Sequence, residues 1–136
     1  MAEPTKRVAI VEDHGALRIF LRDVLTRLGW EVTGTAGTAE AGRALVLESD
    51  PDVAVIDLHL ASEGGGAALI RALAESDAKA KLVVFTATSD PRELRQVLAT
   101  GADGIVLKEG GLPELMAGLE SVSRGERYVS PSIATE

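Results

Sequence analysis

The chain has 136 residues, of which 46% are hydrophobic and 26% charged, which is typical of a single globular domain. Its net charge of −7 disfavours direct nucleic-acid binding, and the absence of cysteine excludes a disulfide framework and a cysteine-ligated zinc site. The N-terminal stretch "MAEPTKRVAIVED" has too short an apolar run for a signal peptide, and no segment approaches the ~20 apolar residues of a membrane helix. We therefore expect a cytoplasmic protein that does not enter a membrane.

Short apolar runs rich in β-branched residues alternate along the chain with segments of helical periodicity. The runs predict strands at residues 7–12, 30–36, 52–58, 81–87 and 104–108. Between them, apolar side chains three and four positions apart predict helices, the first of which has a stripe that starts at Leu17 and stops at Gly29. Thr38 is placed to cap the second helix, and the fourth begins with a cap and Pro91 and ends at Gly101.

Five βα units in a row predict an α/β fold, (βα)5, with a doubly wound, five-stranded parallel sheet. Strands this apolar need helices on both faces of the sheet, and right-handed crossovers leave few other topologies. We expect the flavodoxin-like strand order 2-1-3-4-5. One domain should cover residues 1–125, and the polar, turn-rich residues 126–136 predict a linker-like tail.

Polar side chains stand where the predicted strands end, at the edge of the sheet where open α/β folds form their sites. These residues are Glu12, Asp13, Asp57, Thr86 and Lys108. Taken singly, each has a plain explanation: Asp13 and Asp57 could cap a helix or loop, and Lys108 could be a solvated surface lysine. Taken together, they should converge on one pocket, where three acids repel one another unless a cation lies among them.

The chemistry that fits this pocket is phosphoryl transfer to a carboxylate. Asp57 would be the nucleophile that forms an acyl phosphate. Asp13 and Asp57, with Glu12 acting directly or through water, would hold Mg²⁺ and offset the repulsion between nucleophile and phosphoryl group. Lys108 would pair with the remaining phosphoryl charge, and Thr86 would donate a hydrogen bond to it.

These motifs resemble those of receiver domains of two-component response regulators. The acids of "VEDH", the acid of "VIDLHL", the threonine of "FTA" and the lysine of "VLKE" follow that family's order and spacing over residues 6–125. The resemblance implies that Asp57 is the phosphoacceptor, that Glu12 and Asp13 are metal-site acids, and that the backbone carbonyl of His59 is a third metal ligand. It also implies Thr86 as the switch hydroxyl, Lys108 as the phosphate-binding lysine, and Mg²⁺ as the cofactor.

The resemblance further implies a sensor histidine kinase as partner and a protein that is not a turnover enzyme. Phosphorylation would change the surface formed by residues 91–100, 104–108 and 112–122, with a homodimer as one possible result. The ending "SRGERYVSPSIA" is similar to the end of NarL/FixJ-type receivers, which leads there into a LuxR-type DNA-binding domain absent from this chain.

Three features depart from the family pattern. Ala61 stands where many receivers have proline, and the alignment suggests a one-residue insertion near Gly64–Gly66. That glycine loop is expected to be a flexible turn, with phosphate binding by its amides as the alternative. Ile105 replaces an aromatic residue that in the family turns inward during activation, so coupling from Thr86 should be weaker or different.

Other interpretations remain open at this stage. The chain could be a stand-alone single-domain receiver or a receiver-like interaction module that is never phosphorylated. A phosphatase with an Asp nucleophile would need a second acid where His59 stands, and no G-x-G-x-x-G motif supports a nucleotide-binding Rossmann module. Arg18 and Arg22 form either a solvated helix face or a rim contact for the phosphodonor.

Overall fold

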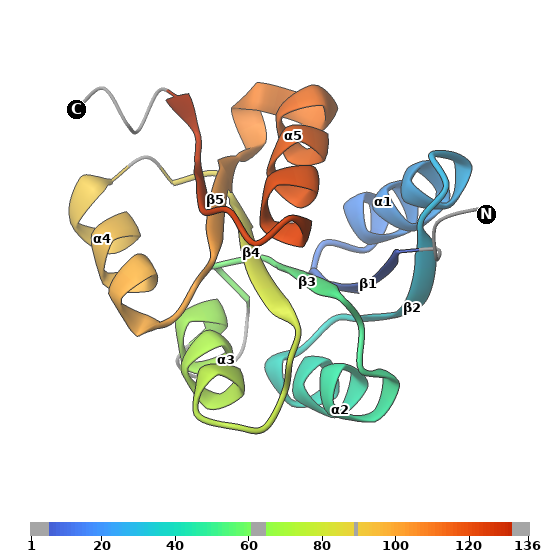
Figure 1. Cartoon of the computed structure of the whole chain (residues 1–136), viewed down its shortest axis with the longest axis horizontal. Coiled ribbons are helices and arrows are strands. Elements are labelled where there is room, and N and C mark those ends of the chain that lie inside the picture. Colours follow the sequence, from blue (N-terminus) through green and yellow to red (C-terminus); the bar gives the residue numbers. More distant parts are fainter. Residues whose placement is uncertain (1–5, 61–64, 89, 132–136) are drawn as a thin grey trace.

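The computed structural model describes residues 6–60, 65–88 and 90–131. Strands and helices alternate along the chain as the sequence predicts (Figure 1). The strands are β1 (Arg7–Val11), β2 (Glu31–Ala36), β3 (Val53–Ile56), β4 (Lys81–Thr86), β5 (Gly104–Leu107) and β6 (Tyr128–Val129). The helices are α1 (Gly15–Arg27), α2 (Ala39–Ser49), α3 (Gly65–Ala74), α4 (Pro91–Thr100), the short 3₁₀ helix η1 (Lys108–Gly110) and α5 (Gly111–Ser123).

All strand pairs of the sheet are parallel, and the strand order is β2-β1-β3-β4-β5-β6. The predicted order 2-1-3-4-5 is therefore confirmed for the first five strands. The sixth strand was not predicted, since β6 lies in the segment expected to be a linker-like tail. Two residues are too short to give a periodic signal, and β6 exists because it pairs with the edge of β5, where Gly104 faces Tyr128.

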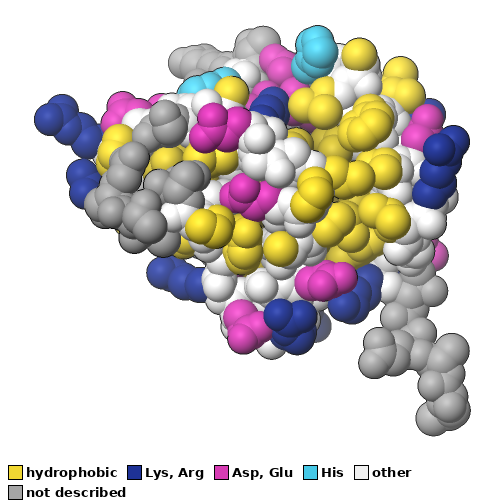
Figure 2. All heavy atoms as spheres, turned by 90° about the horizontal axis from the view of Figure 1, so that it is seen from above, with side chains coloured by type: hydrophobic (Ala, Val, Ile, Leu, Met, Phe, Trp, Pro, Cys, Tyr) yellow, Lys and Arg dark blue, Asp and Glu magenta, His cyan; other side chains and the backbone are white. Residues whose placement is uncertain are grey.

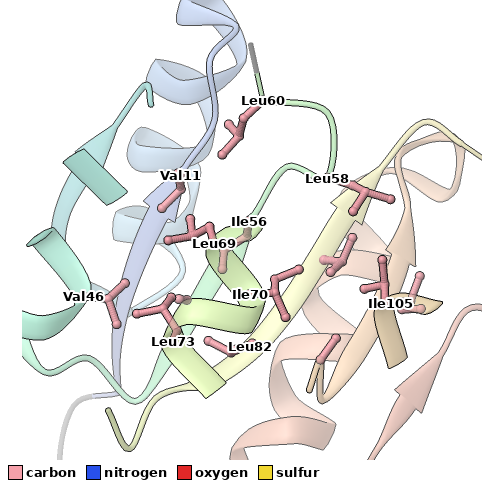
Figure 3. Packing of buried hydrophobic residues seen from close by; sticks show 14 of the residues in the cluster. Val11, Val46, Ile56, Leu58, Leu60, Leu69, Ile70, Leu73, Leu82 and Ile105 are labelled. Atoms are coloured by element: carbon pink, nitrogen blue, oxygen red, sulfur yellow. The ribbon is translucent and has the colours of Figure 1, made fainter. Parts of the chain in front are cut away.

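Alternate residues of each strand enter two separate cores. On one face, Val8, Ile10, Val53 and Val83 pack with residues of α1 and α5. On the other face, residues such as Val11, Ile56 and Val84 pack beneath α2, α3 and α4. Figure 3 shows the second core, in which Leu69, Ile70 and Leu73 of α3 point toward the strands. This covering on both faces explains why the strands are apolar along their whole length.

The helix ends confirm two predicted caps. The Thr38 hydroxyl accepts a hydrogen bond from the Ala41 N–H at 3.1 Å, at the start of α2. Asp90 caps α4 ahead of Pro91, and Gly101 ends that helix. The third helix differs from the expectation, because α3 begins at Gly65 and so includes the end of the predicted glycine loop. Ala61 and Gly64 lie outside the described residues. No helix within the described ranges combines the length and apolarity needed to span a bilayer.

Candidate functional site

The parallel strands bring the predicted polar residues to one edge of the sheet. Val11 pairs with Ile56, so Glu12 and Asp57, the residues that follow them, lie beside each other. Thr86, the last residue of β4, pairs with Leu107, and Lys108 begins η1 directly after it. The polar residues predicted to converge therefore all stand at the carboxyl ends of neighbouring strands.

Glu12, Asp13 and Asp57 form a compact group of carboxylates. Each offers one oxygen, and these oxygens all lie within 4.8 Å of one another. The Glu12 and Asp57 side chains are only 3% and 7% exposed, whereas Asp13 is half-buried. Buried carboxylates this close together need positive charge among them. Their hard oxygen donors are the kind that Mg²⁺ prefers, so the residues present fit that ion.

Lys108 supplies positive charge to this group. Its Nζ lies 2.9 Å from Glu12 Oε1 and 3.7 Å from Asp57 Oδ1. Burial raises the pKa of Glu12, and the neighbouring Asp57 charge adds to this rise. A hydrogen bond from the His14 backbone N–H, at 3.0 Å, and the Lys108 ammonium oppose it. Lys108 is thus a cation held between two acids, within reach of an anion bound at Asp57.

Asp57 is fixed by hydrogen bonds of its backbone and side chain and by the start of the next helix. The Asp57 N–H donates to the Val11 carbonyl at 2.9 Å, and the His59 N–H donates to Asp57 Oδ1 at 3.1 Å. Gly66, in the first turn of α3, packs so closely that an added Cβ would lie 2.2 Å from the Asp57 carbonyl oxygen. At Gly66 the glycine is required by close packing, so the expected flexible turn is wrong there.

The helix boundaries bear on the plain explanations for the two aspartates. The residue in the N-cap position of α1 is His14, not Asp13. The next helix after Asp57 begins at Gly65, well beyond it. Asp57 does accept the His59 N–H at 3.1 Å, which agrees with the loop-capping explanation, and both carboxylates also lie in the acidic group.

Thr86 and His59 make contacts that lead toward α4. Thr86 is fully buried, and its hydroxyl accepts a hydrogen bond from the Thr88 N–H at 3.2 Å. The exposed His59 ring contacts Glu93 of α4, with Nε2 2.6 Å from Oε1, and the Thr88 hydroxyl donates to the other Glu93 oxygen at 3.3 Å. Glu93 was not singled out from the sequence, because an acid in the first turn of a helix is ordinary.

Two arginines that share a predicted helix face have different surroundings. Arg18 donates from Nη1 to the Glu12 carbonyl at 2.8 Å, and it passes so close to Gly37 that a Cβ there would lie 2.8 Å from the same nitrogen. Arg22 is exposed and pairs with Asp23. Arg18 therefore supports the backbone of the acidic site, while Arg22 is a surface charge.

Ile105, in the position of the family's mobile aromatic residue, is fully buried in β5. Figure 3 shows it in the core beneath α3 and α4. Leu94 and Val97 of α4 belong to the same core. The Ile105 side chain is therefore already packed inside the core beneath α3 and α4.

Comparison with known proteins agrees with this geometry. Residues 8–120 match the family described as "Response regulator receiver domain". The curated protein "Response regulator GacA" of Pseudomonas aeruginosa is 32% identical over 131 residues, which cover 96% of this chain and 61% of that protein. The chain thus spans about three fifths of the length of this curated relative.

Solved structures of response regulators share the fold. A two-component response regulator of the LuxR family from Aurantimonas sp. SI85-9A1 superposes with a TM-score of 0.91 and 31% identity, covering 98% of this chain and 95% of that one. Several structures of RcsB superpose on this chain with TM-scores of 0.86 to 0.88 and 25% identity. In the one described as two RcsB dimers bound to two parallel DNAs, the match covers 97% of this chain and 66% of the RcsB chain. With the family match over most of its length, this chain belongs to the response regulator receiver domain family of two-component systems.

Proposed function

We propose that this chain is a phosphorylation-dependent receiver that takes a phosphoryl group from a sensor histidine kinase onto Asp57. The observation that carries this proposal is the site itself: an almost buried Asp57 carboxylate lies within 4.8 Å of two other acids and 3.7 Å from the Lys108 ammonium. A buried strand end with both a cation-binding acid group and a fixed lysine is suited to a dianionic phosphoryl group.

In the proposed reaction, an Asp57 oxygen attacks the phosphorus of a phosphohistidine. The new bond is the phosphorus–oxygen bond of an acyl phosphate, and the phosphorus–nitrogen bond to the histidine breaks, with its electron pair returning to the imidazole. Glu12, Asp13, Asp57 and the His59 carbonyl would hold Mg²⁺, which when bound offsets the charge of the transferred group. Lys108 pairs with a phosphoryl oxygen, and Thr86 donates its hydroxyl to another.

The face formed by α1 and α5 supports a protein phosphodonor. Ile19 and Phe20 of α1 are 51% and 53% exposed, and Phe20 lines a hollow between α1 and α5 that also reaches Lys108. Figure 2 shows hydrophobic side chains gathered on the side of the molecule seen from above in Figure 1, where α1 and α5 lie. Exposed apolar patches of this kind mark protein contacts. We infer that a cytoplasmic kinase domain docks here.

The output proposed for the phosphorylated state is transcriptional. The chain covers about three fifths of a regulator such as GacA, and its structural relatives include a LuxR-family regulator and RcsB, which was solved on DNA. We infer that a LuxR-type DNA-binding domain follows this receiver in a longer protein, and that the surface of α4, β5 and α5 changes its preference for partners, including a second copy. A stand-alone receiver is the alternative.

The test is to incubate the chain with Mg²⁺ and acetyl phosphate and to follow its intact mass. We expect a gain of one phosphoryl group, lost with a chelator and in Asp57→Asn, but kept in Asp23→Asn, a matched variant of an exposed aspartate. No gain in any condition, together with no binding of beryllofluoride, would favour the interaction module that is never phosphorylated. Sustained release of phosphate over many turnovers would favour a phosphatase.

A further inference from the structure

The segment that follows α5 is built into the sheet beside the phosphoryl site. The Tyr128 N–H donates to the Asp103 carbonyl at 3.3 Å, and the Ser130 N–H donates to the Ile105 carbonyl at 3.0 Å. The Leu107 N–H donates to the Ser130 hydroxyl at 2.9 Å. These bonds follow the outer edge of β5 at every second residue as far as its last residue. Figure 1 shows this final strand running along β5.

Ser130 differs from an ordinary linker serine in its burial. The whole residue is 0% exposed, one of few buried polar residues in the described part of the chain. Its hydroxyl takes the place of the backbone carbonyl that a longer β6 would offer to the Leu107 N–H. Because a buried N–H without a partner is unfavourable, this hydroxyl fixes the end of β5 on its outer side.

The end of β5 is where the position of Lys108 is determined. Leu107 pairs with Thr86 of β4 on its inner side and with Ser130 on its outer side. Lys108 is the next residue, and its Nζ reaches Glu12 at 2.9 Å and Asp57 at 3.7 Å. A shift of the Leu107 backbone would move this ammonium relative to both acids.

A glycine of α5 makes room for both β5 and this segment. A Cβ on Gly118, in the middle of α5, would lie 2.7 Å from Cγ2 of Val106 in β5 and 3.2 Å from Cδ1 of the Tyr128 ring. Glycine is unfavourable inside a helix, so its presence there is explained by what packs against it. Gly118 therefore lets both β5 and the Tyr128 ring approach α5 closely.

We propose that Ser130 is a positioning residue for Lys108, so that residues 128–130 form part of the frame of the phosphoryl site. The inference rests on the proposed function, in which Lys108 holds a phosphoryl oxygen. Phosphorylation of Asp57 and packing of residues 128–130 against β5 are then linked equilibria. A phosphoryl group that fixes Lys108 therefore also stabilises the packing of these residues. The segment leading toward a following domain would then respond to phosphorylation through a single hydrogen bond.

The test combines Ser130→Ala with Lys108→Ala in a double-mutant cycle. The measured quantity is the rate of Asp57 labelling by acetyl phosphate at saturating Mg²⁺, followed by intact mass. We expect Ser130→Ala to lower the rate roughly tenfold, as a misplaced group near the reacting atoms does. In the Lys108→Ala background it should change nothing further, because its effect passes through that lysine. Ser123→Ala, which removes a hydroxyl bonded to the Glu120 carbonyl on α5, is the matched control and should label normally.

Amide hydrogen exchange provides a second readout that does not depend on labelling. The Leu107 amide should exchange faster in Ser130→Ala than in the wild type, and beryllofluoride should protect it further in the wild type. An unchanged labelling rate in Ser130→Ala, or the same loss in both backgrounds, would overturn the proposal while leaving Asp57 phosphorylation intact. A wild-type chain that is never labelled would overturn the proposed function and this inference with it.

Discussion

Gly66→Ala is the substitution for which the structure predicts the sharpest loss at the site. The added Cβ would lie 2.2 Å from the Asp57 carbonyl oxygen and 2.8 Å from the Leu58 Cα, both of which are backbone atoms. Neither atom can rotate away as a flexible side chain would. The Gly66 N–H also donates to the Leu58 carbonyl at 2.8 Å, so α3 cannot retreat without losing that hydrogen bond. The site loop or the start of α3 must move.

The expected size of this loss follows from two opposed effects. Replacing glycine by alanine within a helix stabilises by about 1 kcal/mol. Overpacking against a fixed neighbour costs about 1–3 kcal/mol, and the upper end or more applies here because the neighbour is backbone. We expect a net loss of about 2 kcal/mol in the free energy of unfolding. For a chain of this size that corresponds to a fall in Tm of roughly 6–8 °C.

Thermal unfolding followed by circular dichroism measures this loss directly. Gly15→Ala is the matched control, because it is the same substitution in the first turn of α1, where the nearest atom to the new Cβ is the Arg18 Nη2 at 3.8 Å. It should be neutral or slightly stabilising. If Gly66→Ala melted at or above the wild-type temperature, as the control should, the close approach of α3 to Asp57 would not be a packing constraint.

Three further predictions concern the charge of Lys108, the phenol of Tyr128 and the helix cap at Thr38. Lys108→Met should destabilise the metal-free protein by about 1–2 kcal/mol, because Glu12 is left as a buried unpaired charge. Adding Glu12→Gln should restore most of this loss, as measured by urea titration. No restoration would contradict the pairing of Lys108 with Glu12. Burial raises the pKa of Tyr128 above 10.0, so the stability due to its neutral phenol should decline as pH rises from about 10 toward the folded pKa. Tyr128 is the sole tyrosine, so tyrosinate absorbance reports its pKa, and a value at or below 10.0 would contradict this. Thr38→Ala should lower stability by about 1 kcal/mol, whereas Thr26→Ala, whose hydroxyl bonds within its own helix, should have little effect.

The fold and the acidic site could be predicted from the sequence because their signals are local and periodic. The strands are apolar runs with helical stripes between them, and Thr38 and Pro91 mark helix starts by their own backbone preferences. Once the strands are parallel, the residues after them must meet at one edge, which places Asp57 beside Glu12.

Contacts that depend on exact distances between distant segments could not be predicted. Gly66 looks like any glycine of a polar loop, and only its packing against Asp57 shows why no side chain fits there. The bond from Arg18 to the Glu12 carbonyl likewise has no periodic signature, since an arginine on a polar helix face is usually solvated. The contact between His59 and Glu93 joins the loop after β3 to the first turn of α4, and the sequence does not encode the distance between them.

The tail shows how a correct local interpretation can miss a strand. Residues 126–130 are polar and turn-rich, which indicates a linker when the segment is considered alone. A parallel sheet, however, leaves one edge of its last strand with unpaired N–H and carbonyl groups, and such an edge accepts even a two-residue strand. Tyr128 and Ser130 satisfy those groups, and the burial of Ser130 separates it from a solvated linker serine. Residues 128–130 are therefore bonded to the sheet, and a variant truncated at residue 125 should lose the outer hydrogen bond of Leu107 next to the phosphoryl site.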